Sequence, residues 1–139
     1  MTALNVDTRR ARHGSRSRDV LMVLIGLLLV LTFVHDFDHV RQGRALGMEL
    51  YGVGVLSVVT TATTLVLVAR RHSLAGYAAF LLGVSTVVGV AAVHVAPRHP
   101  LVSDSYGAAH VDALSWLVIT SMMAVGLAVA IAGAHETRR

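Results

Sequence analysis

The apolar residues of this chain are gathered in four long blocks, at 20–34, 50–68, 74–93 and 114–133, with short polar stretches between them. Three of these blocks approach the roughly 20 residues that a membrane-spanning helix requires. A transmembrane β-barrel would instead alternate polar and apolar residues over about ten positions, and these blocks do not alternate. The pattern therefore predicts an all-α fold, an integral membrane four-helix bundle whose first partner is the lipid bilayer.

The polar residues between the blocks set the expected boundaries. We expect one four-helix domain at 19–135, preceded by a flexible basic tail at 1–18 and followed by a short end at 136–139, with helices at about 19–43, 49–69, 74–95 and 110–134. Basic residues precede the first block, as they do in a secretory signal. No small-residue cleavage site follows that block, so we expect it to be retained as a span.

The arginines predict how the bundle is oriented. An even number of spans puts both termini on one side, and nine of the twelve arginines lie there or in the loop 69–73, while the chain has no lysine. The positive-inside rule then places the N and C termini in the cytoplasm, as in a multi-pass protein of a bacterial-type inner (plasma) membrane. No recognised motif or aromatic platform accompanies the charge, so we expect no nucleic-acid partner.

The histidines and acidic residues have the opposite distribution. Five of eight histidines and five of eight acids fall on the predicted outer side: His35, His39, His94, His99, His110, Asp36, Asp38, Glu49, Asp104 and Asp112. Ionisable groups at a membrane boundary are costly unless they face a bundle interior, a wet cavity or a metal. This histidine-rich outer face is therefore the predicted functional end.

The stretch VHDFDHVRQG, residues 34–43, follows the first block directly. Because 20–34 rises only about 22 Å, less than the roughly 30 Å of membrane hydrocarbon, the helix should continue through this stretch, with Gly43 as its C-terminal cap. His35, Asp38 and His39 then project from one face at i, i+3 and i+4. Two imidazoles and a carboxylate in this arrangement can hold a transition metal.

The remaining acid of this stretch, Asp36, points elsewhere on the helix. It could pair with Arg41 or Arg44, or face water and headgroups. If it carries no metal, it is a candidate proton acceptor in catalysis.

The other three helices each bring a candidate ligand to the same end: Glu49, His94 and His110. Each also has a structural explanation. Glu49 could complement the positive end of its helix, and Asp112 could be an N-cap that leaves His110 outside the helix proper. His99 lies between two prolines, as a surface residue or part of a flexible lid.

These placements predict a metal site formed by His35, Asp38, His39, His94 and His110, with Asp36 and Glu49 as candidate catalytic proton acceptors. Nitrogen and oxygen ligands without sulfur suit a divalent transition metal, and the residue types do not distinguish zinc, iron, manganese and copper. The chain has no cysteine.

Three functions fit this site. The first is a metal-dependent membrane enzyme acting on a lipid-borne or periplasmic substrate, or a protein that only binds or senses the metal. The second is a non-enzymatic accessory subunit of a membrane complex, with a pH-responsive outer cluster. The third is a b-type haem protein, with His35 or His39 and His94 as axial ligands. The chain has no Walker loop and no G-x-S-x-G, and no charge lies in the middle of a span, which argues against a proton-coupled transporter.

Small residues at four-residue spacing suggest how the helices pack. They occur as Ala79-x-x-x-Gly83, as Ser85-x-x-x-Gly89, and at Ala124, Ala128 and Ala132. Such stripes allow close helix approach in lipid. They could serve packing within one bundle or a homodimer.

Overall fold

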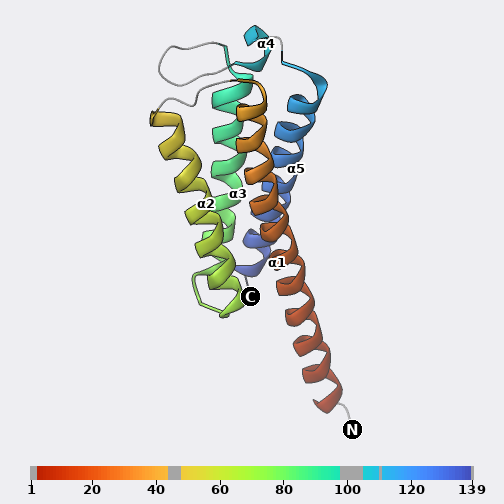
Figure 1. Ribbon diagram of the computed structural model, residues 1–139. Helices are drawn as coiled ribbons and strands as arrows, with labels where there is room; N and C mark the ends of the chain where they lie inside the picture. The colour runs from red at the N-terminus through yellow and green to blue at the C-terminus, as the bar shows by residue number, and fades with distance from the viewer. Residues whose placement is uncertain (1–2, 44–47, 98–104, 110, 139) are drawn as a thin grey trace.

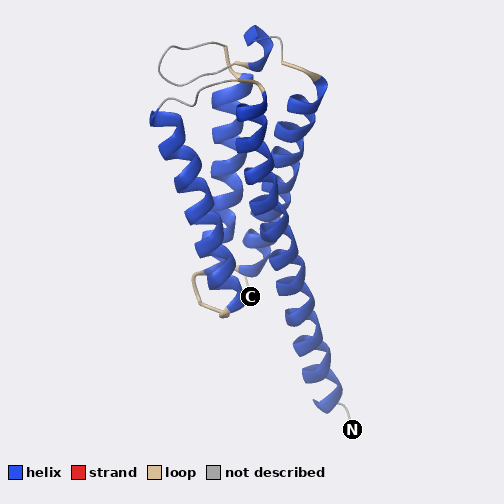
Figure 2. Cartoon of the chain, viewed as in Figure 1, coloured by secondary structure: helices blue, strands red, loops and turns tan. Residues whose placement is uncertain are grey.

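The computed structural model describes residues 3–43, 48–97, 105–109 and 111–138, and throughout these residues the regular elements are helices (Figure 2). In chain order they are α1 (Ala3–Arg41), α2 (Met48–Ala69), α3 (Ala75–Val90), the π-helix η1 (Ala91–Val95), α4 (Tyr106–Ala109) and α5 (Ala113–Glu136). Side chains are described at 17–43, 52–97, 105–107 and 111–138. The all-α prediction is confirmed.

Four helical segments are long and apolar enough to cross a membrane: Ser17–Arg41, Gly52–Ala69, Ala75–Val95 and Ala113–Glu136. They lie side by side, with the two termini and the α2–α3 turn at one end and the remaining connections at the other (Figure 1). Each span carries large apolar side chains that are exposed at the surface of the bundle, including Val23, Leu56, Leu81 and Leu117. Such surfaces suit a multi-pass membrane protein, because lipid covers them at no hydrophobic cost.

α1 is the central element for the candidate site. Leu21, Ile25, Leu28 and Thr32 are all buried, and their spacing of three and four residues gives one inward stripe. The helix continues through the stretch 34–41 and ends before Gly43, which has a φ of +66° and whose amide donates to the Val40 carbonyl at 3.0 Å. The predicted cap at Gly43 is confirmed. Toward the N-terminus, α1 extends back to Ala3 and so includes most of the basic segment 1–18.

α3 and α5 form the tightest contact of the bundle, and glycines make it possible. A Cβ on Gly83 would collide with the backbone of Gly126 and Ala130, and a Cβ on Gly133 would lie 2.5 Å from the Phe80 amide nitrogen. The predicted stripe Ala79-x-x-x-Gly83 therefore packs within one bundle. The face of α5 that meets it carries Gly126, Ala130 and Gly133, whereas Ala124 is exposed. Ser85 and Gly89 are also exposed, so the second predicted stripe of α3 lies outside this contact.

Candidate metal centre

α1 brings two histidines to the end of the bundle that is remote from both termini. His35 and His39 are one turn apart, and their rings lie 4.6 Å apart between centroids, edge to face. His39 is only 2% exposed, and His35 is half-buried. The inward stripe that begins at Leu21 continues into these residues, because the same three- and four-residue spacing repeats through position 39. Because the earlier residues of this stripe, from Leu21 to Thr32, are buried, both imidazoles also point into the bundle.

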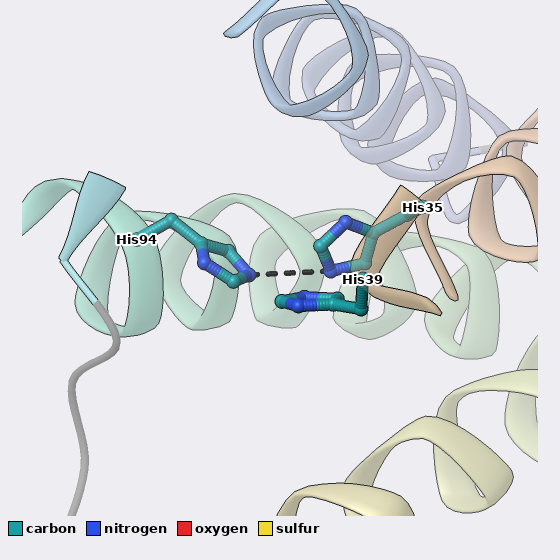
Figure 3. A group of neighbouring side chains, drawn as sticks. All are labelled: His35, His39 and His94. Carbon is teal, nitrogen blue, oxygen red and sulfur yellow. Dashed lines mark hydrogen bonds between the residues drawn. The ribbon is translucent and has the colours of Figure 1, made fainter. Parts of the chain in front are cut away.

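His94 comes from the other side of the contact, on η1. This π-helix ends the third span with a wider turn, in which the Ala96 amide donates to the carbonyl of Ala91 at 2.9 Å, five residues back. Such widened turns recur at functional sites in helical proteins. His94 is 3% exposed and faces His35 and His39 from its own helix (Figure 3).

The three-histidine group (His35, His39 and His94) could hold a metal ion, since one nitrogen from each ring lies within 4.8 Å of the others. The Nε2 atoms of His35 and His94 are 3.2 Å apart. In a tetrahedral site with metal–nitrogen bonds of about 2.0–2.1 Å, two ligand nitrogens lie about 3.3 Å apart. One pair is therefore already at ligand spacing, and the His39 nitrogen, within 4.8 Å of the other two, would have to move closer to complete the set.

The contact between His35 and His94 also constrains their protonation. One Nε2 must donate and the other must accept, so the accepting ring is a neutral imidazole, the form that binds metals. His35 Nδ1 is buried and has no hydrogen-bond partner in the described part of the chain. A buried ring nitrogen without a partner carries a desolvation cost, which a metal bound through Nε2 would not remove.

Tyr106 packs against the three-histidine group at the end of the bundle that is remote from both termini. It is fully buried on the short helix α4, with its ring 4.4 Å from the His94 ring and 6.2 Å from the His39 ring. The ring of Trp116 of α5 also lies against Tyr106, at 5.9 Å between ring centroids and edge to face. The sequence offered no signal for Tyr106, because a lone tyrosine between a serine and a glycine has no periodic pattern.

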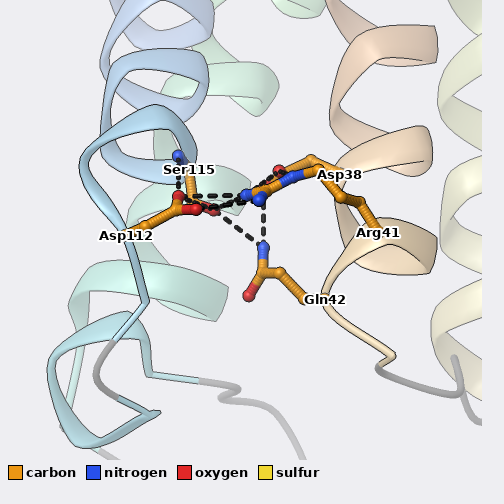
Figure 4. A network of polar contacts seen from close by, with 5 residues as sticks. All are labelled: Asp38, Arg41, Gln42, Asp112 and Ser115. Carbon is orange, nitrogen blue, oxygen red and sulfur yellow. Dashed lines mark hydrogen bonds and ion pairs between the residues drawn. The ribbon is translucent and has the colours of Figure 1, made fainter.

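Asp38 does not join the three-histidine group. Its two carboxylate oxygens accept hydrogen bonds from residues shortly after it in the chain, one from Arg41 Nε at 2.8 Å and the other from Gln42 Nε2 at 2.6 Å. Arg41 also contacts Asp112 at 2.8 Å, and Gln42 donates to Ser115 Oγ at 2.9 Å. We call these five residues the α1–α5 polar network (Figure 4).

Asp112 anchors this network at the start of α5. It is the N-cap of that helix, accepting from the Ser115 amide at 3.1 Å. Hydrogen bonds from Arg41 and from the Ser115 backbone lower the pKa of Asp112 to about 2. The suggested role of Asp112 as the N-cap of this helix is confirmed.

Asp36 lies on the wall of a cavity of about 310 Å³ that all three histidines also line. A Cβ on Gly54 of α2 would lie 3.6 Å from Asp36 Oδ1, an ordinary contact distance, so the carboxylate faces α2 at Gly54. The suggested pairing of Asp36 with Arg41 is wrong, because Arg41 is bound to Asp38 and Asp112.

The other predicted site residues lie outside the side chains that the structure describes. Glu49 belongs to the first turn of α2, but its side chain is not among those described, and His110, His99 and Arg44 fall outside the described residues. Their proposed roles stay predictions.

Comparisons with protein-family models, with curated proteins and with solved structures find no match to this chain. The assignment of a function therefore depends on the geometry of the site itself.

Proposed function

We propose that this chain is a metal-binding membrane protein in which the three-histidine group holds one divalent transition metal at the extracytoplasmic end of the bundle. The observation that carries the proposal is the convergence of His35, His39 and His94, from two spans, within the reach of one ion. The outer placement follows from the arginine-rich opposite end, which the positive-inside rule assigns to the cytoplasm.

Three protein ligands favour a catalytic role over a structural one. Structural zinc sites are closed by four protein ligands, whereas catalytic sites have three and leave one position for water or substrate. All three histidines line the same cavity, so the open position would face space that a substrate can enter. A metal in this position would activate water or polarise a substrate oxygen.

Asp36 is the proton acceptor that this proposal requires. Its carboxylate lies on the cavity wall and has none of the contacts that hold Asp38. Asp38, which the sequence grouped with the ligands, would instead hold the outer turn of α1 in place through Arg41. A metal-dependent membrane enzyme is thus the function that the site supports best.

The geometry favours an ion over haem. Two axial histidines must be separated by a porphyrin ring that lies between their Nε2 atoms, and those of His35 and His94 are 3.2 Å apart with the third ring beside them. A purified protein with a Soret band would contradict this preference.

Elemental analysis of detergent-purified protein tests the proposal. We expect an equimolar divalent transition metal in the wild type, its loss in His35→Ala/His39→Ala, and its loss in His94→Ala. His72→Ala and His135→Ala are matched controls, because both residues are exposed and lie at the opposite end of the bundle. A metal-free wild type from metal-supplemented medium, or equal metal in the His94→Ala variant, would overturn the proposal.

A further inference from the structure

The cavity beside the three-histidine group is long and runs toward the middle of the membrane. On the third span its lining extends from His94 to Leu82, which is a rise of about 18 Å at 1.5 Å per residue. α2 lines it from Val53 to Thr60, and α5 contributes Met122. Its outer end carries the histidines and Asp36, and its length matches an extended acyl chain of medium length.

Away from that outer end the wall offers little to a polar ligand. The hydroxyl groups of Thr60, Ser85 and Thr86 all donate to carbonyls of their own helices, at 2.8–3.0 Å. Leu56, Leu82, Val90 and Met122 supply apolar surface. A wall of this kind suits a hydrocarbon segment, with specificity left to the few polar groups at one end.

The cavity opens sideways into the membrane. Thr60, Ser85 and Gly89 line it and are nevertheless exposed at the surface of the bundle. They belong to the second and third spans, so the opening between α2 and α3 faces hydrocarbon. A ligand that is dissolved in the bilayer can therefore enter without crossing water.

We propose that the cavity binds a single-chain lipid with an oxygen-bearing head group, the chain lying between α2 and α3 and the head at the three-histidine group. This inference rests on the proposed function, whose substrate class it names. An alcohol or ester oxygen suits a metal held by three imidazoles.

Gly89 provides a substitution that blocks the cavity with little effect on the fold. It lines the cavity, and a Cβ on it would meet nothing within 4 Å. The side chain of Gly89→Leu would therefore occupy the space assigned to the lipid chain. Gly26→Leu is the matched control, because a Cβ there also meets nothing within 4 Å and Gly26 does not line the cavity.

The experiment uses a photoreactive tetradecanol with a diazirine in its chain, incorporated with the full-length protein into phosphatidylcholine nanodiscs. Crosslinked positions are mapped by mass spectrometry, and metal content is measured on the same samples. We expect crosslinks near Leu82, Thr86 or Met122 in the wild type and in Gly26→Leu, loss of those crosslinks in Gly89→Leu, and unchanged metal in all three.

Labelling that persists in Gly89→Leu, or that is spread over lipid-facing side chains such as Phe37 and Leu117, would overturn the lipid site. A wild type without metal whose labelling is still lost in Gly89→Leu would overturn the proposed function while supporting the lipid site.

Discussion

Asp112 combines two roles at the first turn of α5, and two substitutions separate them. Asparagine caps a helix as well as aspartate but cannot form the ion pair with Arg41, whereas alanine can do neither. We expect Asp112→Ala to lower the melting temperature by a few degrees and Asp112→Asn to lower it less, because exposed ion pairs contribute little. Fluorescence of Trp116, the single tryptophan, follows unfolding. Equal decreases in melting temperature in Asp112→Ala and Asp112→Asn would show that the helix cap contributes nothing to stability.

The same carboxylate predicts a dependence on pH. The folded pKa of Asp112 is about 2, below its ordinary value of 3.8, so its charged form stabilises the fold fully above about pH 4. That contribution is lost as the pH falls toward 2. The difference in melting temperature between wild type and Asp112→Asn should therefore be constant above pH 4 and shrink below it. A difference that grows on acidification would contradict the ion pair.

Tyr106 should control how fast a metal leaves the three-histidine group. Its ring packs against the His94 ring at 4.4 Å, and the apolar shell of a metal site governs access of solvent. We expect Tyr106→Ala to release metal to a chelator about tenfold faster and Tyr106→Phe, which keeps the ring, to release it at the wild-type rate. A fast Tyr106→Phe variant would mean that the hydroxyl group, not ring packing, retains the metal.

The ligand set was only partly predictable from single residues. His35, Asp38 and His39 do share one side of α1, but Asp38 and His39 are about 100° apart on the helix, on either side of His35. In the bundle α1 packs against more than one helix, so residues on this side of α1 contact different partners. His39 lies toward His94, and Asp38 lies toward α5. The spacing of residues along a helix predicts the direction in which each side chain projects. The positions of the neighbouring helices determine what that side chain contacts.

Among the helix pairs, α3 and α5 depend most on glycine. Gly83→Ala would force its new methyl group into the backbone of α5, which cannot rotate away as a side chain can. We expect the free energy of unfolding to fall by about 1–3 kcal/mol, the usual effect of overpacking, with a lower melting temperature in detergent. Gly89→Ala on the same helix meets nothing within 4 Å and should leave stability equal or raise it by up to about 1 kcal/mol. A similar decrease in the free energy of unfolding in Gly83→Ala and Gly89→Ala would show that helix flexibility, and not the close approach of α5, matters at Gly83.

The four spans could be predicted from the lengths of the apolar blocks. The residues at which the helices begin and end depend on local capping and turn interactions. The start of α5 is fixed at Ala113 by the Asp112 cap, a choice that the sequence left open. The widened turn of η1 and the four-residue helix α4 leave no periodic signal, because neither is long enough to repeat a pattern. These two short elements carry His94 and Tyr106, so the least predictable segments complete the site.

At the scale of the whole molecule, charge separation gives the bundle two different ends. The termini and the α2–α3 turn, with most of the arginines, share one end, and the three-histidine group and the α1–α5 polar network share the other. Hydrophobic blocks and an even number of spans were sufficient to predict this grouping. Which histidines contact one another could not be predicted in this way, because that depends on how the four helices are arranged around one another.

The orientation proposed here can be tested directly, since the chain has no cysteine to replace. Ser73→Cys lies in the exposed turn between α2 and α3, and Gly107→Cys lies on the exposed surface of α4 at the opposite end. With the arginine-rich end in the cytoplasm, a membrane-impermeant maleimide added to intact cells should label Gly107→Cys and not Ser73→Cys. Both should react after the membrane is opened, and the wild type should never react. Labelling of Ser73→Cys alone in intact cells would invert the topology and place the metal site in the cytoplasm, where the supply of metal and of substrate would differ.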